Sequence, residues 1–322
     1  MSNNEAFRPS PHQEHQWTIA PDGPAGCTQV TLAVAGAIDP TALDAVVGRH
    51  EILRTTFSRR PGIRLPVQVV HDELAPGWSE SDLGDVDPAQ QPGRVASLAA
   101  EERARPFDLD QGPLIRAHLV RLAPERQALV LTASSLCLDA ATVPALVAEV
   151  AAAAGAGAAP PEEPFQYADY AEWQHELADS EDEGPKAGRD HWADHEGVRS
   201  PEVLLPEDEA GAHAIDVAYD AGLAAAVTAL ATRYGTSPET VVHAGWHALL
   251  ARLSGADEIV TALRDGGPGR DPLDGLIGPS GRAVPLRTAV SPETTFAELL
   301  ARVDRTRSDA LGAEDYAPMA AA

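Results

Sequence analysis

The chain has 322 residues, 44% of them hydrophobic, which is enough to bury the core of one large domain or of two ordinary ones. Acidic residues outnumber basic ones by 49 to 24, and the formal net charge of −25 argues against nucleic acid and anionic membranes as partners. Most of this acidity is expected to serve solvation, and a basic partner is the alternative.

Targeting and redox signals are also weak. No run of eighteen apolar residues predicts a membrane span, and the polar N-terminus does not resemble a signal peptide. The two cysteines, Cys27 and Cys137, lie far apart in the sequence, which favours a reduced, cytoplasmic setting over a disulfide framework.

The first half alternates predicted strands and helices. Asp39-Pro40 provides an N-cap and a first-turn proline for a helix that ends near His50, and a second helix is expected near 95–103, after a polar loop. Strands are expected over 28–35, 65–70, 114–121 and 127–133. The last two should pair as a hairpin.

The stretch from Leu129 to Thr142 organises the chain. A short apolar strand stops at Ser134-Ser135, as a central strand does, and a helix should begin near Thr142. An enzyme built this way would hold its reacting group where the strand stops. Here Cys137 and Asp139 accompany the two serines.

The second half follows a linker that is rich in Ala, Gly and Pro, over 151–161. The acidic run over 179–183 should be a solvated bridge between halves. Helices are expected over 165–178, 221–234, 238–253, with Ser237 as N-cap, and 296–311, and strands near 214–218, 259–263 and 282–287. Strands alternating with helices predict an α/β protein.

Several motifs along the chain resemble those of the condensation domains of nonribosomal peptide synthetases. Residues 134–140, SSLCLDA, occupy the place of the family's HHxxxDG core motif. The flanking matches occur in family order: Ser10 to Trp17 (SxxQxxxW), Arg49 to Phe57 (RHExLRTxF), Phe107 to Leu114 (FDLxxGPL), Tyr167 to Gln174 (YxDYAxWQ), and Leu276 to Arg287 (IGxFVNTLPLR).

The resemblance implies two chloramphenicol-acetyltransferase-like subdomains in a V arrangement, with a channel between them. We expect an N-terminal subdomain over 1–176, an acidic bridge over 177–209 and a partial C-terminal subdomain over 210–322. The last match, at 314–318, resembles the family's HQDxPF, after which a complete member continues for about a hundred residues. The second subdomain is therefore expected to be incomplete, in a truncated protein or in a piece of a longer synthetase.

The catalytic motif is where the chain departs from the family. Condensation joins an amine to a thioester, and the family's second motif histidine serves as base or positioning group. Ser135 stands there, and Ser134 stands at the first histidine. A serine hydroxyl has no useful basicity without a base beside it. The pair is interpreted as a polar turn; a serine nucleophile in a new arrangement, with a histidine arriving from elsewhere in the fold, is the alternative.

Other motif residues are interpreted as structural or channel-lining. In the family the motif aspartate pairs with an arginine, so Asp139 should pair with Arg287 or cap its own helix. Arg54 should brace the fold. Cys137 occupies a channel position of the motif but should behave as a small buried hydrophobe. Arg282, which replaces the family's asparagine after Pro279-Ser280-Gly281, would narrow or re-charge the channel.

These features predict a degenerate condensation-like module that no longer forms amide bonds by the histidine mechanism. It would interact with a carrier protein, an adenylation domain or a tailoring enzyme, and not with nucleic acid or a membrane. The alternatives are an active acyltransferase that works by positioning and a vestigial domain that supports a neighbouring adenylation domain. No bound cofactor or metal is expected; a carrier's phosphopantetheine arm would enter if substrate is handled.

Overall fold

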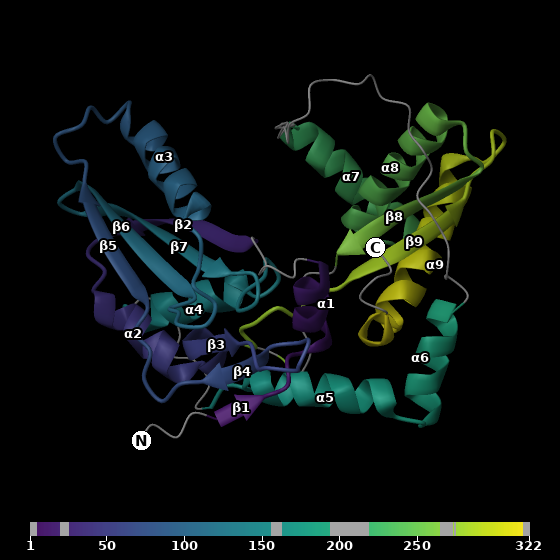
Figure 1. The fold of residues 1–322 in the computed structure, drawn as a ribbon. Coiled ribbons are helices and arrows are strands. Elements are labelled where there is room, and N and C mark those ends of the chain that lie inside the picture. The colour runs from purple at the N-terminus through teal and green to yellow at the C-terminus, as the bar shows by residue number, and fades with distance from the viewer. Residues whose placement is uncertain are drawn as a thin grey trace. The chain divides into compact units, whose positions relative to one another are not determined.

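The computed structural model describes residues 5–19, 26–155, 163–193, 219–264, 273 and 275–317. Two compact units make up the chain (Figure 1): unit 1 combines Met1–Ser180 with Gly266–Gly281, and unit 2 combines Glu181–Asp265 with Arg282–Ala322. The subdomain limits at 176 and 210 stay a prediction, because 194–218 lie outside the described residues.

A four-stranded sheet lies at the centre of unit 1, in the order β2-β7-β6-β5 (Figure 1). Its strands are β2 (Cys27–Ala35), β5 (Gly77–Asp82), β6 (Ile115–Ala123) and β7 (Arg126–Ser134). The predicted hairpin of β6 and β7 is confirmed, and β7 has a neighbour on each side, as expected of a central strand. The sequence predicted a polar loop where β5 runs parallel to β6, and that prediction is wrong. As an edge strand with polar side chains, β5 lacks a clear apolar alternation.

In the described part of unit 1, a second sheet and the helices α1 to α5 accompany the four-stranded sheet. The second sheet has the order β1-β4-β3, with β1 at Glu5–Phe7, β4 at Val67–Val70 and β3 at Thr55–Ser58. The helices are α1 (Pro11–Ile19), α2 (Pro40–Arg49), α3 (Gln91–Ala104), α4 (Val143–Ala153) and α5 (Tyr167–Asp179), with a short 3-10 turn, η1 (Glu51–Arg54), after α2. The predicted cap of α2 is confirmed, since the Asp39 side chain accepts a hydrogen bond from the Thr41 N–H.

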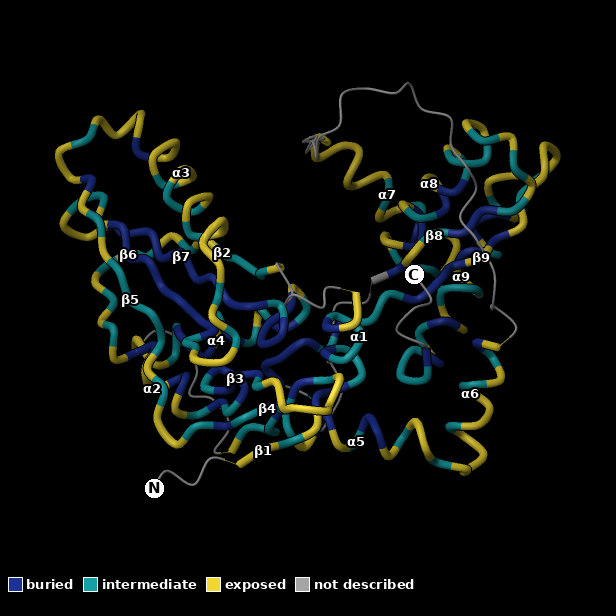
Figure 2. Tube along the Cα trace, viewed as in Figure 1, coloured by how far each residue is buried: buried dark blue, intermediate teal, exposed yellow. Residues whose placement is uncertain are grey.

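The core of unit 1 lies between the four-stranded sheet and the helices of the unit. Figure 2 shows β6 and β7 as largely buried and α3 as largely exposed. The core includes the fully buried Leu43, Leu53, Ile115, Leu129 and Leu146. It also includes Leu276 and Ile277, which belong to unit 1 although they follow β8 in the sequence.

Unit 2 pairs two strands, β8 (Glu258–Arg264) and β9 (Ala283–Ala289), in an antiparallel sheet. Its helices are α6 (Glu183–Ala193), α7 (Ala221–Tyr234), α8 (Pro238–Ser254) and α9 (Phe296–Gly312), followed by the 3-10 turn η2 (Glu314–Tyr316). The N-cap predicted for α8 is confirmed, since Ser237 accepts from the Thr240 N–H. The sequence placed an acidic bridge where α6 begins, and the strand predicted near 214–218 lies outside the described residues. None of the described helices is both long and apolar enough to cross a membrane.

Candidate functional site

Ser134 ends β7 and is completely buried. Its N–H donates to the Leu114 carbonyl at 2.9 Å, and its hydroxyl oxygen accepts from the Leu136 N–H at 3.3 Å. Its carbonyl accepts from the N–H groups of Cys137 and Leu138 at 2.8 and 3.1 Å. Backbone partners on every side fix this serine in a tight turn, which is how a Ser side chain commonly satisfies local backbone groups.

Ser135 is partly exposed, and its N–H donates to the Gly26 carbonyl at 3.1 Å. Within the described part of the chain, no side chain hydrogen-bonds its hydroxyl. The neighbouring-strand histidine, His118, instead shares a 2.8 Å hydrogen bond with Ser81, and His175 donates from Nε2 to the Pro9 carbonyl at 2.8 Å. A nucleophilic serine needs a base within hydrogen-bond reach, and the described residues supply none at Ser135.

Asp139 lies after the turn and is only 5% exposed. One carboxylate oxygen accepts from the N–H groups of Ala141 and Thr142 at 3.0 and 3.1 Å, just before α4. The other accepts from the N–H groups of Ser280 and Gly281 at 2.9 and 2.7 Å. Amide donors on both oxygens satisfy a buried carboxylate, so this side chain joins the turn to a segment far along the chain.

Arg287, the partner that the resemblance suggested for Asp139, lies in β9 of unit 2. Its guanidinium forms a 2.7 Å ion pair with Glu258 of β8. Asp139 belongs to unit 1 and Arg287 to unit 2, and their pairing stays a prediction. Arg54 donates to the His71 carbonyl and lies 3.5 Å from the Glu51 carboxylate, which ties η1 to the end of β4.

The segment Leu276–Gly281, which begins the match to the family's IGxFVNTLPLR motif, packs against the Asp139 turn. The Thr142 hydroxyl donates to the Gly278 carbonyl at 2.8 Å, and the Tyr167 hydroxyl donates to the Pro279 carbonyl at 2.7 Å. A Cβ added at Gly278 would overlap the Tyr167 ring. Arg282, the first residue after this segment, donates to the Ala317 carbonyl at 2.6 Å inside unit 2.

Cys137 is fully buried in the core of unit 1. Burial raises the pKa of its thiol well above the ordinary value, because a thiolate would be desolvated there. A thiol held in this form is not a nucleophile at neutral pH. Its environment is therefore that of a small hydrophobic side chain.

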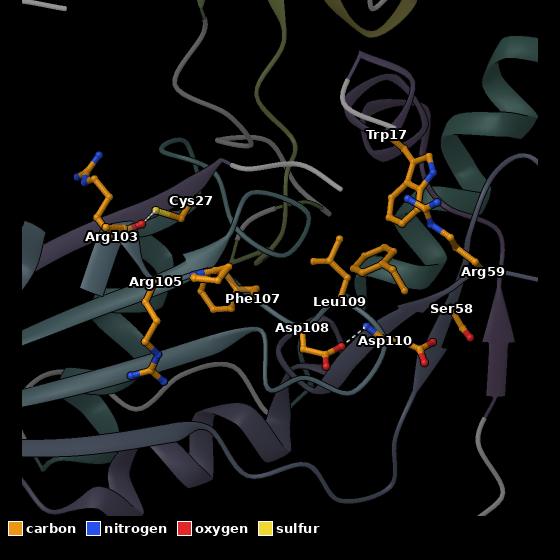
Figure 3. A pocket seen from close by; sticks show the side chains of 13 residues that line it. Trp17, Cys27, Ser58, Arg59, Arg103, Arg105, Phe107, Asp108, Leu109 and Asp110 are labelled. Atoms are coloured by element: carbon orange, nitrogen blue, oxygen red, sulfur yellow. Dashed lines mark hydrogen bonds between the residues drawn. The ribbon is translucent and has the colours of Figure 1, made fainter. Parts of the chain in front are cut away.

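A cavity of about 780 Å³ opens in unit 1 beside the end of β7 (Figure 3). Cys27, one of its lining residues, pairs with Ser134 across the β2–β7 ladder. The lining combines aromatic with charged side chains, chiefly Trp17, Phe57, Phe107, Arg59, Arg103, Arg105, Asp108 and Asp110. Arg59 lies over the Trp17 ring, 5.1 Å from its centroid. Such a mixture suits a ligand with both apolar and polar groups.

Sequence reasoning missed this cavity. In the sequence, Phe107-Asp108-Leu109 stands out only as a family signature, and no motif marks Arg59 or Arg103. Nothing in their spacing shows that a loop after β3 and a loop after α3 meet, because that contact depends on the order of the strands.

The family model of the condensation domain matches residues 9–318. The chain belongs to the condensation domain family. It is 32% identical, over 286 residues, to phosphinothricin tripeptide synthetase PhsC of Streptomyces viridochromogenes, covering 85% of this chain and 26% of that one. It is 34% identical, over 302 residues, to the isonitrile lipopeptide synthase of Mycobacterium tuberculosis, covering 87% of this chain and 12% of that one. The chain thus spans about a quarter or less of these curated relatives.

Solved structures share its mixed α/β fold, as the sequence predicted. The SgcC5 protein of Streptomyces globisporus superposes with a TM-score of 0.78 at 26% identity, over 95% of this chain and 74% of that one. The X-domain of teicoplanin biosynthesis, solved in a complex with OxyB, superposes with a TM-score of 0.74 at 28% identity, over 98% and 72%. The chain is therefore a condensation-domain-like module, and the curated relatives that it matches include peptide synthetases.

Proposed function

We propose that this chain is a condensation-type module of a nonribosomal peptide pathway that does not form amide bonds by the histidine mechanism and serves as an interaction module in the cytoplasm. The observation that carries the proposal is the pair Ser134-Ser135 at the two motif histidines. Ser134 is engaged with backbone groups, and Ser135 lacks a described base. Among the described residues, no histidine at this turn could therefore take a proton from the attacking ammonium.

The preserved parts of the motif support the same proposal. Asp139 and the segment Leu276–Gly281 are joined by several hydrogen bonds although the histidines are absent. A network of this kind maintains the fold whether or not chemistry takes place beside it. The module would therefore act by binding a partner through its surface. The partner is proposed to be a carrier protein, an adenylation domain or a tailoring enzyme.

The X-domain favours the tailoring enzyme among these partners. That domain was solved in a complex with OxyB, and it is 28% identical to this chain. The net charge of −25 suggests a partner with a basic face, whose binding would weaken as salt is raised.

A condensation assay with loaded donor and acceptor carriers tests the proposal. Wild type and Ser135→Ala should both give no product above the protein-free reaction, while a pull-down of the pathway partner should succeed at low salt and weaken at high salt. Ser97→Ala, on the exposed face of α3, is the matched control. Product formed by wild type and lost in Ser135→Ala, with Ser97→Ala active and partner binding retained, would contradict the proposal.

An acyltransferase that works by positioning alone is the second candidate, and the cavity beside β7 favours it. A free amine is already a good nucleophile, and preorganised proximity can supply much of a barrier. A carrier's phosphopantetheine arm would then deliver the thioester. In that case wild type and Ser135→Ala would form product equally, and filling the cavity by Leu109→Trp would abolish it.

A further inference from the structure

One buried guanidinium holds the end of α3 and the residues that follow it. Arg116 lies in β6 and is only 5% exposed. Its Nη2 donates to the carbonyls of Glu102 and Arg105 at 2.9 and 2.8 Å, and its Nη1 donates to the Pro106 carbonyl at 3.3 Å. Its Nε donates to the Glu102 carboxylate at 3.2 Å. The guanidinium carbon also lies 3.8 Å from the centroid of the Phe107 ring, which is a cation–π distance.

The chemistry of arginine suits this position. A carbonyl in a helix accepts from the N–H four residues later, and for Glu102 that residue is Pro106, which has no N–H. Arg116 supplies the missing donor. Its positive charge also lies at the C-terminal end of a helix, where a cation is favourable. A lysine carries its donors on one nitrogen and could not reproduce the fork that reaches three separate carbonyls.

The sheet prepares this docking site across all four of its strands. A row of residues directly opposite one another consists of Gln29 in β2, Thr132 in β7, Arg116 in β6 and Gly77 in β5. Residues paired in this way share one face of a sheet. Gln29 donates to the Ala99 carbonyl of α3 at 2.8 Å. A Cβ added at Gly77 would lie 2.9 Å from Cγ of Arg116, so the glycine leaves room for the arginine side chain.

The segment that Arg116 holds is one wall of the cavity beside β7. Residues 103–110 form a continuous part of the lining of that cavity. At the edge of this wall, the Cys27 thiol donates a weak hydrogen bond to the Arg103 carbonyl at 3.9 Å (Figure 3). The distance between the wall and the start of β2 therefore depends on how the end of α3 is held.

We propose that Arg116 is the positioning residue of this cavity wall. It acts through the residues that it binds, so a ligand in the cavity would contact a loop whose place is set from β6. The apolar contacts of α3 come from Val95 and Leu98, which lie earlier in the helix. Loss of the guanidinium should therefore release the helix end and the wall while the sheet stays folded.

Labelling of the two free thiols with an aromatic disulfide reagent tests the proposal on the full chain. Cys27 reports on the wall, and the fully buried Cys137 reports on unfolding of unit 1. In Arg116→Lys, Cys27 should label at least about tenfold faster than in wild type, while Cys137 keeps its wild-type rate. Arg116→Met should accelerate Cys27 further. Arg121→Met, the matched control at an exposed position of the same strand, should leave both rates unchanged.

Arg116→Lys keeps the positive charge beside Glu102 and is expected to fold, which circular dichroism and a melting curve establish. A wild-type rate at Cys27 in this variant would overturn the proposal, because the wall would then keep its place without the guanidinium. Equal acceleration of Cys27 and Cys137 would also overturn it, since that result shows only a loss of stability of the whole unit. The assay contains no substrate and no partner, so its outcome is independent of the proposed function.

Discussion

Acidification should destabilise unit 2 through His247. This side chain is completely buried beside Thr261, and burial, with a smaller effect of the nearby His243 charge, lowers its pKa from 6.5 to about 4. Protonation is therefore easier in the unfolded chain than in the folded one. The stability of the neutral form is complete above the unfolded pKa and declines as the pH falls from 6.5 towards 4.

The size of the effect follows from the two pKa values. The difference between 6.5 and about 4, at about 1.4 kcal/mol for each pKa unit, limits the loss to about 3 kcal/mol. Between pH 7 and pH 5, a single group with these values loses about 2 kcal/mol of unfolding free energy. That is a substantial part of the stability of an ordinary domain.

Urea unfolding at pH 7 and pH 5, at one protein concentration, measures this loss. His247→Gln can still hydrogen-bond Thr261 but does not titrate, so its loss between the two pH values should be smaller than that of wild type by about 2 kcal/mol. His15→Gln, on the partly exposed side of α1, is the control and should follow wild type. Equal losses in wild type and His247→Gln would refute the reasoning.

Three further outcomes can be checked by simple measurements. Asp139→Ala leaves the N–H groups at Ser280 and at the start of α4 without their acceptor and should cost about 1–4 kcal/mol in urea unfolding, whereas an unchanged midpoint would contradict its bridging role. Gly278→Ala should cost at least about 2 kcal/mol, because its Cβ would overlap the Tyr167 ring and its φ of 145° disfavours side chains; a melting temperature within error of wild type would count against this packing. An aromatic disulfide reagent should label one thiol of the native protein, the partly exposed Cys27, and two after unfolding, and rapid native labelling of Cys137 would contradict its burial.

The sequence predicted those elements whose patterns are local. The capping residues of α2 and α8 stand directly before these helices in the sequence, and the β6–β7 hairpin joins two mainly apolar strands across a short turn. The strands that it missed, β1, β3 and β5, are short or polar edge strands, whose pairing is decided by distant partners. Helix α6 was missed because its acidic start resembles a solvated bridge, although Trp192 packs into the core of unit 2.

The site was predictable in position but not in its contacts. The family motif located Ser134, Ser135 and Asp139, and the structure shows that Asp139 is buried. The donors to its second oxygen come from Ser280 and Gly281, more than a hundred positions away, where no periodicity points back to it. The cavity likewise depends on loops that come together only when the strands are ordered.

The way in which the chain passes between its units has a consequence for its synthesis and its engineering. Residues 266–281 belong to unit 1, but they lie between β8 and β9 of unit 2. On the ribosome, unit 1 therefore cannot complete its core when Ser180 emerges; it waits until Leu276 and Ile277 have been made, after most of the helices of unit 2. Any chimaera that exchanges the N-terminal half with a relative must accordingly carry the Leu276–Gly281 segment along with that half, as a second crossover point.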